Sequence, residues 1–354
     1  MNKRPYQVLS TLYHLSRFFL QNAEFDSFSP EGWPLEWAFA ANRLESPDHW
    51  LLSKLQWAIK EYTDKLGTCE FNAALAILED FIINTLSRLY VPMIRKELWT
   101  DDSETLGRRQ AIYALLYRTL KTFTLLFNPI TPYLSEALYQ KVHRKLDRKL
   151  PDSVNFEGWP EPDEKMRNPT LEEEFDVLFK CVSLAYAARQ QAKLKRRWPL
   201  GKVIVVASEK VFNTLRKAES LFLELTNVKA AEYAQQVPDY VASENWVSAS
   251  EGDSHVFVSG QRDEKLLGEG LMRDLARRVQ ALRKELGYVP TDILEAVHIA
   301  ELDDESIGLL ESYLEEMAGL VRAEKVYLHS SRGEVKAEWH ESELDGKRIY
   351  INIH

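Results

Sequence analysis

The chain has 354 residues, a formal net charge of −9 and a sequence pI near 5.6. Its 45% hydrophobic and 28% charged residues are ordinary for a soluble globular protein of two or three domains. Two cysteines, no CxxC pair and scattered histidines argue against a disulfide scaffold and against a zinc site.

The two cysteines, Cys69 and Cys181, are expected to be buried thiols in a reducing compartment. No stretch approaches a membrane span, and His14 and Arg17 interrupt the first apolar run, so no signal peptide is expected. The sequence therefore predicts a cytoplasmic protein without membrane contact.

Residues 1–150 are predicted to form a multi-helix bundle. Apolar residues recur at helical spacing after Pro5, and a second helix over 46–67 has Ser46 as its N-cap. A third helix is apolar around so much of its circumference that it is expected to be central in the bundle, and to kink or break at Pro92. Two further helices are predicted within 108–127 and 131–146.

Residues 151–200 are predicted to be a Pro-rich linker and a long connecting helix. One stripe of this helix is apolar from Leu171 to Ala185, and the same spacing then reaches Arg189 and Arg196. The buried face thus becomes basic in the last turns. The helix is therefore expected to project past its core or to meet something anionic.

Residues 201–354 are predicted to form a smaller α+β domain. No repeat is visible in this part of the sequence. The expected strands are 202–207, 228–234, 293–300 and 324–329, the expected hairpins are 245–259 and 334–353 with its turn at Asp345-Gly346, and the expected helices are 209–224, 262–286 and 304–319.

No catalytic constellation is present. The phosphate-binding pattern GxxxxGK[ST], the nucleophile pattern GxSxG and a GxGxxG after a strand are all absent from the sequence. The chain is therefore not expected to act as an enzyme by itself, and no catalytic or metal-binding residue is assigned.

A basic cluster near residue 190 is the strongest sign of a binding function. It contains no acidic residue, and its candidate RNA-binding side chains are Arg189, Lys193, Lys195, Arg196, Arg197 and Trp198. Cations are favoured at a helix C-terminus, but that effect is confined to the last turn and does not account for so many charges. Trp198 precedes Pro199 and is interpreted as a core plug at the junction, with base stacking as the alternative.

Two other basic faces are weaker candidates for RNA binding. They comprise Arg88, Arg95 and Lys96 in the bundle, and Arg273 and Arg277 on the helix predicted over 262–286. The alternative for each face is a solvated helix surface whose cations pair with acidic residues of the same helix.

Several segments, in co-linear order, resemble the C-terminal part of isoleucyl-tRNA synthetases of the archaeal and eukaryotic type. The resemblance covers nearly the whole chain. "NPITPYLSE" is shared more widely with the valyl and leucyl enzymes, whereas "ARQQAKLKRRWPL" is the most specific piece. Other segments that carry it are "PYQVLSTLYHLSRFFLQNAEFD", "DHWLLSKLQWAIKEYTDKL", "SVNFEGWPEPDE" and "RRVQALRKELGY".

The resemblance implies a helical anticodon-binding domain of the class I synthetase type and a C-terminal extension that helps to engage the tRNA. The class I signatures HIGH and KMSKS are absent from this sequence. No cofactor is therefore expected in this chain, since ATP and Mg would be used by a catalytic domain outside it. The start at Met1 is expected to mark an isolated domain or a separated half of such an enzyme.

The leading hypothesis is a recognition module of an isoleucine–tRNA ligase that binds the anticodon stem-loop of tRNA(Ile) and works with the catalytic and editing part. One alternative is a protein-interaction or structural module that docks on a partner domain. Another is a stand-alone RNA-binding paralogue.

Overall fold

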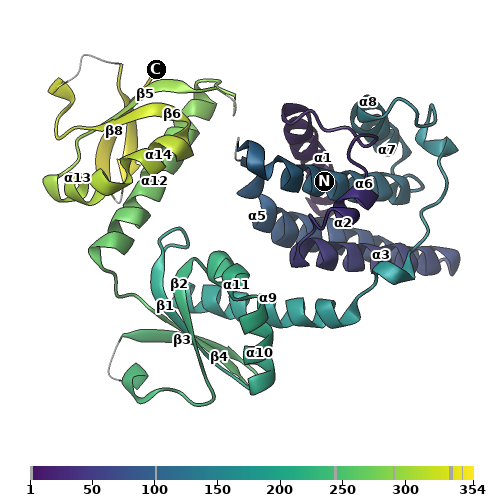
Figure 1. The fold of residues 1–354 in the computed structure, drawn as a ribbon, viewed down its shortest axis with the longest axis horizontal. Coiled ribbons are helices and arrows are strands. Elements are labelled where there is room, and N and C mark those ends of the chain that lie inside the picture. The colour runs from purple at the N-terminus through teal and green to yellow at the C-terminus, as the bar shows by residue number, and fades with distance from the viewer. Residues whose placement is uncertain (1–2, 100–101, 243–244, 290–291, 335–337, 345) are drawn as a thin grey trace. The chain divides into compact units, whose positions relative to one another are not determined.

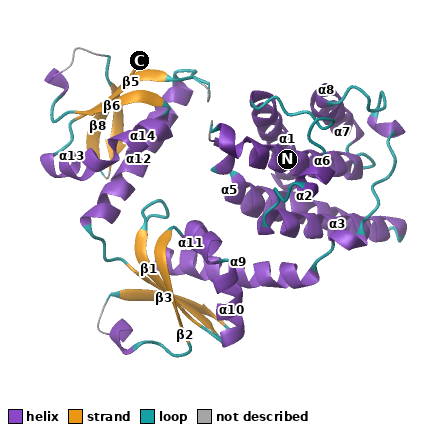
Figure 2. Ribbon diagram, in the orientation of Figure 1, coloured by secondary structure: helices purple, strands orange, loops and turns teal. Residues whose placement is uncertain are grey.

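The computed structural model describes residues 3–99, 102–242, 245–289, 292–334, 338–344 and 346–354 (Figure 1). Two compact units share the chain, Met1–Asp176 and Val177–His354. The division falls inside α9, Pro169–Gln191, and within the segment 151–200 that the sequence assigns to a linker and connecting helix. The described part of the first unit is helical, and the second contains two mixed sheets, as predicted (Figure 2).

The first unit is a multi-helix bundle with an aromatic and aliphatic core. Its α-helices and π-helices up to residue 146 are α1 (Lys3–Phe25), α2 (Leu35–Ala40), α3 (Ser46–Gly67), α4 (Phe71–Asp80), a π-helix (Phe81–Tyr90), α5 (Val91–Ile94), α6 (Leu106–Phe127), α7 (Pro132–Leu138), a second π-helix (Tyr139–His143) and α8 (Arg144–Leu146). Phe81 and Phe123 stack with their ring centroids 4.4 Å apart, and both are buried. This stacking contact packs the π-helix Phe81–Tyr90 against α6.

The predicted break at Pro92 does not occur. Tyr90 and Val91 both have helical backbone angles, so the π-helix continues directly into α5. Pro92 lies in the first turn of α5. The absence of its backbone N–H costs little there, because the π-helix before it does not follow the hydrogen-bonding pattern of an α-helix. The N-cap of α3 is likewise Glu45, one residue before the predicted Ser46, and it forms a capping box with Asp48.

The two cysteines differ in environment. Cys181 is buried, as expected, and burial raises the pKa of its thiol to about 11. Cys69 is exposed, contrary to the expectation, because α3 has ended at Gly67 and the chain turns there with a left-handed backbone, φ 60° at Cys69.

The first sheet lies in residues 177–259, here called the first module. Its strands are β1 (Leu200–Val206), β2 (Val228–Ala234), β3 (Trp246–Glu251) and β4 (Ser254–Ser259), in the order β2-β1-β4-β3. β1 and β2 are parallel, and the other neighbours are antiparallel. Two helices, α10 (Glu209–Lys217) and α11 (Glu219–Thr226), connect β1 to β2, where one helix was predicted; the helical backbone is interrupted at Ala218.

The second sheet lies in residues 264–353, here called the second module. It begins with α12 (Glu264–Glu285), followed by β5 (Leu294–Ala300), α13 (Asp304–Leu310), α14 (Leu314–Val321), β6 (Ala323–Leu328), β7 (His340–Leu344) and β8 (Lys347–Ile353). The strand order is β6-β5-β8-β7, and Leu275 and Val279 of α12 are buried in one core with Val297 and Ile351 of the sheet.

The two modules repeat one topology, although no repeat is visible in the sequence. In both modules the first two strands are parallel, the other pairs are antiparallel, and a long helix comes before the first strand. A left-handed residue precedes the second strand of each, Asn227 with φ 53° and Arg322 with φ 50°. Because the shared features are backbone conformations, they leave little trace in residue identity.

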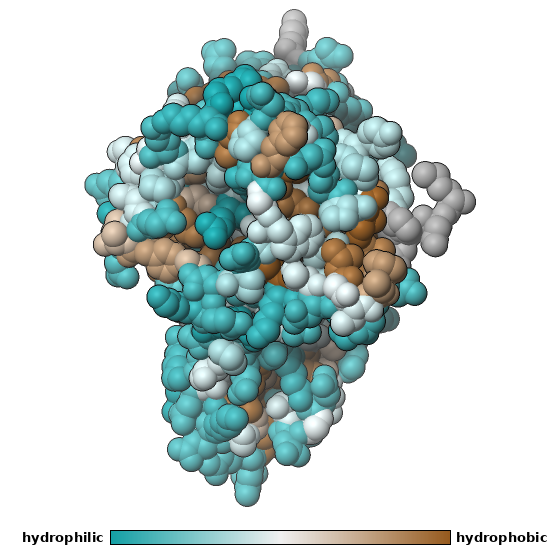
Figure 3. Space-filling model, turned by 90° about the vertical axis from the view of Figure 1, so that its right-hand side faces the viewer, coloured by the Kyte–Doolittle hydropathy of each residue, from teal (hydrophilic) through white to brown (hydrophobic). Residues whose placement is uncertain are grey.

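No described helix has the length and apolarity required to cross a bilayer. On the face shown in Figure 3, hydrophilic side chains predominate, and apolar residues are confined to small areas between them. Such scattered exposure is normal for a protein surface. Among the described residues, no cluster of three or more His, Cys, Asp or Glu side chains is arranged to hold a metal ion.

Candidate nucleic-acid interface

The basic turn, residues 193–197, follows the end of α9. Lys193 has a left-handed backbone, φ 54°, and Leu194 N donates to Arg189 O at 2.9 Å. This is the hydrogen-bonding pattern of a helix C-terminus closed by a left-handed residue. It directs four exposed cations to the surface, Lys193, Lys195, Arg196 and Arg197.

Arg189 does not lie on that surface. Its side chain is fully buried and donates to carbonyl oxygens of Lys195 (3.2 Å), Trp198 (2.9 Å), Thr226 (2.9 Å) and Asn227 (2.7 Å). Burial, together with the neighbouring positive charges, lowers the pKa of Arg189 to about 10, so the guanidinium stays charged at neutral pH. The prediction that Arg189 binds RNA does not fit this geometry, because the side chain is buried and its two Nη groups hold the basic turn against the start of β2.

Trp198 is a plug, in agreement with the first of its two interpretations. It is 9% exposed, and its indole Nε1 donates to Asp274 Oδ2 at 2.9 Å. A Cβ added at Gly270 would lie 2.5 Å from Cδ2 of the ring, so the indole packs directly on the backbone of α12. Trp198 therefore leaves the set of RNA-contacting candidates, since a buried ring cannot stack on a base.

Asp274 is an acidic partner of the basic turn that the sequence did not predict. Besides Trp198, it accepts a hydrogen bond from Lys195 Nζ at 3.2 Å, and Arg197 Nη1 lies 4.0 Å from its other oxygen. Burial acts to raise the pKa of Asp274, but the hydrogen bonds and the nearby cations outweigh burial and lower it. The lack of acidic residues near position 190 in the sequence thus did not mean a lack of acidic partners.

The four exposed cations of the basic turn are not equally available. The guanidinium carbon of Arg196 lies 3.6 Å from the ring centroid of Tyr186, and this stacking contact holds the Arg196 side chain against the protein surface. Lys195 and Arg197 are about half-exposed and share Asp274. Lys193 has no side-chain partner within the described ranges, so it is the most available cation for an anionic ligand.

Helix α12 links to the basic turn through Asn227. Arg273 Nη1 donates to Asn227 Oδ1 at 2.7 Å, and Asn227 Nδ2 donates to Arg196 O at 3.1 Å. Arg273 also pairs with Glu269 at 2.5 Å, so much of its charge is neutralised. Arg277 lies one turn further along α12 and is exposed, so it remains a candidate for RNA binding.

The bundle candidates lie in the first unit. Arg88, Arg95 and Lys96 are exposed at the end of the π-helix Phe81–Tyr90 and just after α5. Arg88 Nη1 donates to Asn84 Oδ1 at 2.9 Å. These three residues belong to the first unit, whereas the basic turn lies in the second.

Comparison with known proteins identifies the class. The sequence profile of the family described as "Anticodon-binding domain of tRNA ligase" matches residues 48–205. The chain thus contains an anticodon-binding domain of a tRNA ligase.

The similar full-length proteins are isoleucine–tRNA ligases. The one from Methanopyrus kandleri is 25% identical over 98% of this chain, the one from Pyrobaculum aerophilum 29% over 98%, and one from Dehalococcoides mccartyi 30% over 85%. The chain spans only 37%, 33% and 29% of the length of these relatives. The chain fits a C-terminal fragment of an isoleucine–tRNA ligase.

Proposed function

We propose that the chain is the tRNA(Ile)-recognition module of an isoleucine–tRNA ligase and binds the anticodon region of the tRNA. The observation that carries the proposal is the basic turn, in which a buried guanidinium holds the backbone so that four cations face solvent. Cationic side chains contact phosphates and set the register of a nucleic acid, whereas bases are read by other contacts.

The phosphate contacts are assigned to Lys193, Arg196, Arg197 and Arg277. Because the whole chain has a net charge of −9, long-range attraction of RNA is weak, and binding depends on this local patch. The ATP-dependent attachment of isoleucine, with its ATP and Mg, belongs in this proposal to a catalytic part outside the chain. The proposal places the protein in the cytoplasm, with translation.

Neutralising the basic turn tests the assignment. Each phosphate contact adds about 0.7 to 0.9 to the slope of log affinity against log salt concentration. We expect the double variant Arg196→Gln, Arg197→Gln to lower that slope by about 1.5 for the anticodon stem-loop of isoleucine tRNA. Titration of a fluorescent stem-loop at several salt concentrations measures it.

A matched control removes two exposed cations elsewhere. Lys325 and Arg348 of the second module are exposed and lie outside the proposed interface, so Lys325→Gln, Arg348→Gln should keep the slope of the unmodified chain. A slope that is the same in all three proteins would remove the basic turn from the interface.

A second candidate function, docking on the catalytic part of the synthetase, is favoured by apolar side chains after α12. Val289 and Ile293 are 52% and 69% exposed. Burial of such residues is a usual source of affinity between proteins. If docking is the main role, Val289→Ser, Ile293→Ser should weaken binding to a recombinant catalytic half by about tenfold or more while binding of the stem-loop is unchanged, which pull-down and titration would distinguish.

A further inference from the structure

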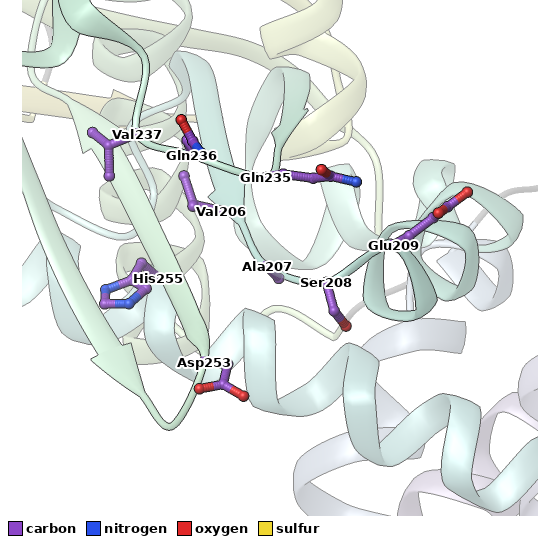
Figure 4. A pocket seen from close by; sticks show the side chains of 9 residues that line it. All are labelled: Val206, Ala207, Ser208, Glu209, Gln235, Gln236, Val237, Asp253 and His255. Carbon is purple, nitrogen blue, oxygen red and sulfur yellow. The ribbon is translucent and has the colours of Figure 1, made fainter.

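An open crevice of about 680 Å³ lies at the carboxyl ends of the parallel strands β1 and β2 (Figure 4). In Figure 4 the segment with Gln235 and Gln236 lies opposite the hairpin that carries Asp253 and His255, and Ser208 lies between them at the start of α10. The complete lining is Val206, Ala207, Ser208, Glu209, Gln235, Gln236, Val237, Asp253 and His255. Open α/β sheets bind ligands at this edge, outside the carboxyl ends of the strands.

The polar groups of the crevice are unused by the fold. Gln235, Gln236 and Asp253 are exposed and His255 is half-buried, yet none of the four has a side-chain hydrogen bond or ion pair within the described residues. Their hydrogen-bonding capacity is therefore available to a ligand.

In the second module, ion pairs bridge the same edge of the sheet. Asp303, the N-cap of α13, the helix that follows β5, pairs at 2.7 Å with Lys347, the first residue of β8. The corresponding residues of the first module are two serines, Ser208 as N-cap of α10 and Ser254 as the first residue of β4. A second ion pair, Arg332 to Glu301 at 3.2 Å, also spans the edge in the second module. Two copies of one topology thus differ at this edge, with ion pairs across it in one and an opening in the other.

The chemistry of the lining selects the ligand. No lysine or arginine lines the crevice, and Glu209 and Asp253 repel phosphate. The Asp253 carboxylate accepts hydrogen bonds from N–H groups, the Gln235 and Gln236 amides both donate and accept, and the His255 ring offers a flat face. A planar, uncharged group with amino donors fits these requirements.

We propose that the crevice holds one unpaired nucleobase that carries an exocyclic amino group, that is cytosine, adenine or guanine but not uracil, from the RNA bound by the basic turn. The proposal rests on the RNA-binding function proposed above and adds base selectivity to it. Carboxylates accept from the cytosine amino group and glutamine amides pair with adenine, whereas uracil has no amino group to donate. Aromatic and imidazole rings stack on the faces of such splayed bases.

Two stem-loop RNAs with one common stem, and loops of cytidine or of uridine, test the proposal on the full chain. Because phosphate contacts are the same in both, we expect the cytidine loop to bind about tenfold more tightly. Asp253→Asn, which is isosteric and lies at an exposed site, should reduce the preference to about twofold, because the amide serves either base. His255→Ala should weaken the cytidine loop by about tenfold through lost stacking.

The matched control is Asp304→Asn in the second module. Asp304 is exposed and occupies the first position of α13, and its removal changes the net charge by the same amount without touching the crevice. This variant should keep the full preference for the cytidine loop. Equal binding of the two loops by the unmodified chain, or an unchanged preference in Asp253→Asn, overturns the proposal.

The outcomes also separate this proposal from the one on which it rests. One outcome is that both loops bind in a salt-dependent way, with an affinity that falls in Arg196→Gln, Arg197→Gln but is the same for the two bases. That result supports the recognition function and overturns the proposal that the crevice binds a base. Failure of the unmodified chain to bind either RNA at low salt overturns both.

Discussion

Arg189 and Arg283 occupy equivalent positions in the two modules, near the C-terminal ends of α9 and α12. Four residues after each, the chain is left-handed, at Lys193 and Gly287, and five residues after each, an amide donates back to the arginine carbonyl at 2.9 Å. Both guanidinium groups then hold backbone carbonyls. Those held by Arg283 belong to Val289, Asp292, Val321 and Arg322. The planar fork with five donors explains why arginine, not lysine, holds so many acceptors.

Arg189→Lys is predicted to lower both the stability of the second unit and the affinity for RNA. A single ammonium cannot reach four separated carbonyls, and each lost hydrogen bond from a charged donor costs about 1.5–3 kcal/mol. We expect a loss of about 3 kcal/mol in the free energy of unfolding, measured by denaturant titration, and a lower affinity for the stem-loop, because the basic turn is no longer held.

Arg283→Lys provides the matched control. It should destabilise the protein by a similar amount but leave RNA affinity unchanged when measured well below the unfolding transition. The turn that Arg283 holds includes the apolar Val289 and contains no cation between Leu286 and Val289. Equal losses of affinity in both variants would show that Arg189 acts on RNA binding only through general stability.

At the scale of elements, α12 packs against both modules of the second unit. Its C-terminal half packs on the second sheet through Leu275 and Val279. Its N-terminal half carries Gly270, which lies under the Trp198 indole. A glycine is required there because the ring approaches closer than a side chain permits.

Gly270→Ala is predicted to destabilise the protein by about 1–3 kcal/mol, as overpacking of a filled site does. The new Cβ would lie 2.5 Å and 2.6 Å from two carbons of the Trp198 ring, so the indole or the helix must shift. Gly308→Ala in α13 is the control, since nothing lies within 4 Å of its added Cβ. That change should stabilise by about 0.5–1 kcal/mol because alanine favours the helix. Thermal unfolding of the two variants should therefore move in opposite directions.

At the scale of the whole molecule, the positive charge needed for RNA is local. A chain with net charge −9 places four exposed cations at the end of α9, where Asp274 pairs with two of them, Lys195 and Arg197, and Glu269 pairs with the nearby Arg273. The repeated topology adds a second level of organisation. One copy has the basic turn and an open crevice, and the other has an uncharged turn and ion pairs across the same edge.

Much of the fold follows from local sequence signals. Helical periodicity predicted the bundle, and alternating or β-branched runs predicted strands close to their observed bounds, because both patterns depend on neighbours a few residues apart. The interruption at Ala218 and the continuous helix through Pro92 were missed. Each depends on the backbone conformation of a single helical turn, and the types of the residues in that turn predict this conformation only weakly.

By itself, the sequence determined the resemblance to isoleucyl-tRNA synthetases, the order of the elements and the position of the basic turn, because all three depend on motifs and on residue spacing. The tertiary structure decided which cations face outward. Arg189 and Lys193 are equally charged, but Thr226 and Asn227, nearly forty residues further on, supply the acceptors that bury the first and leave the second exposed. Contacts between distant segments decide desolvation, and desolvation decides whether a charge serves the fold or a ligand.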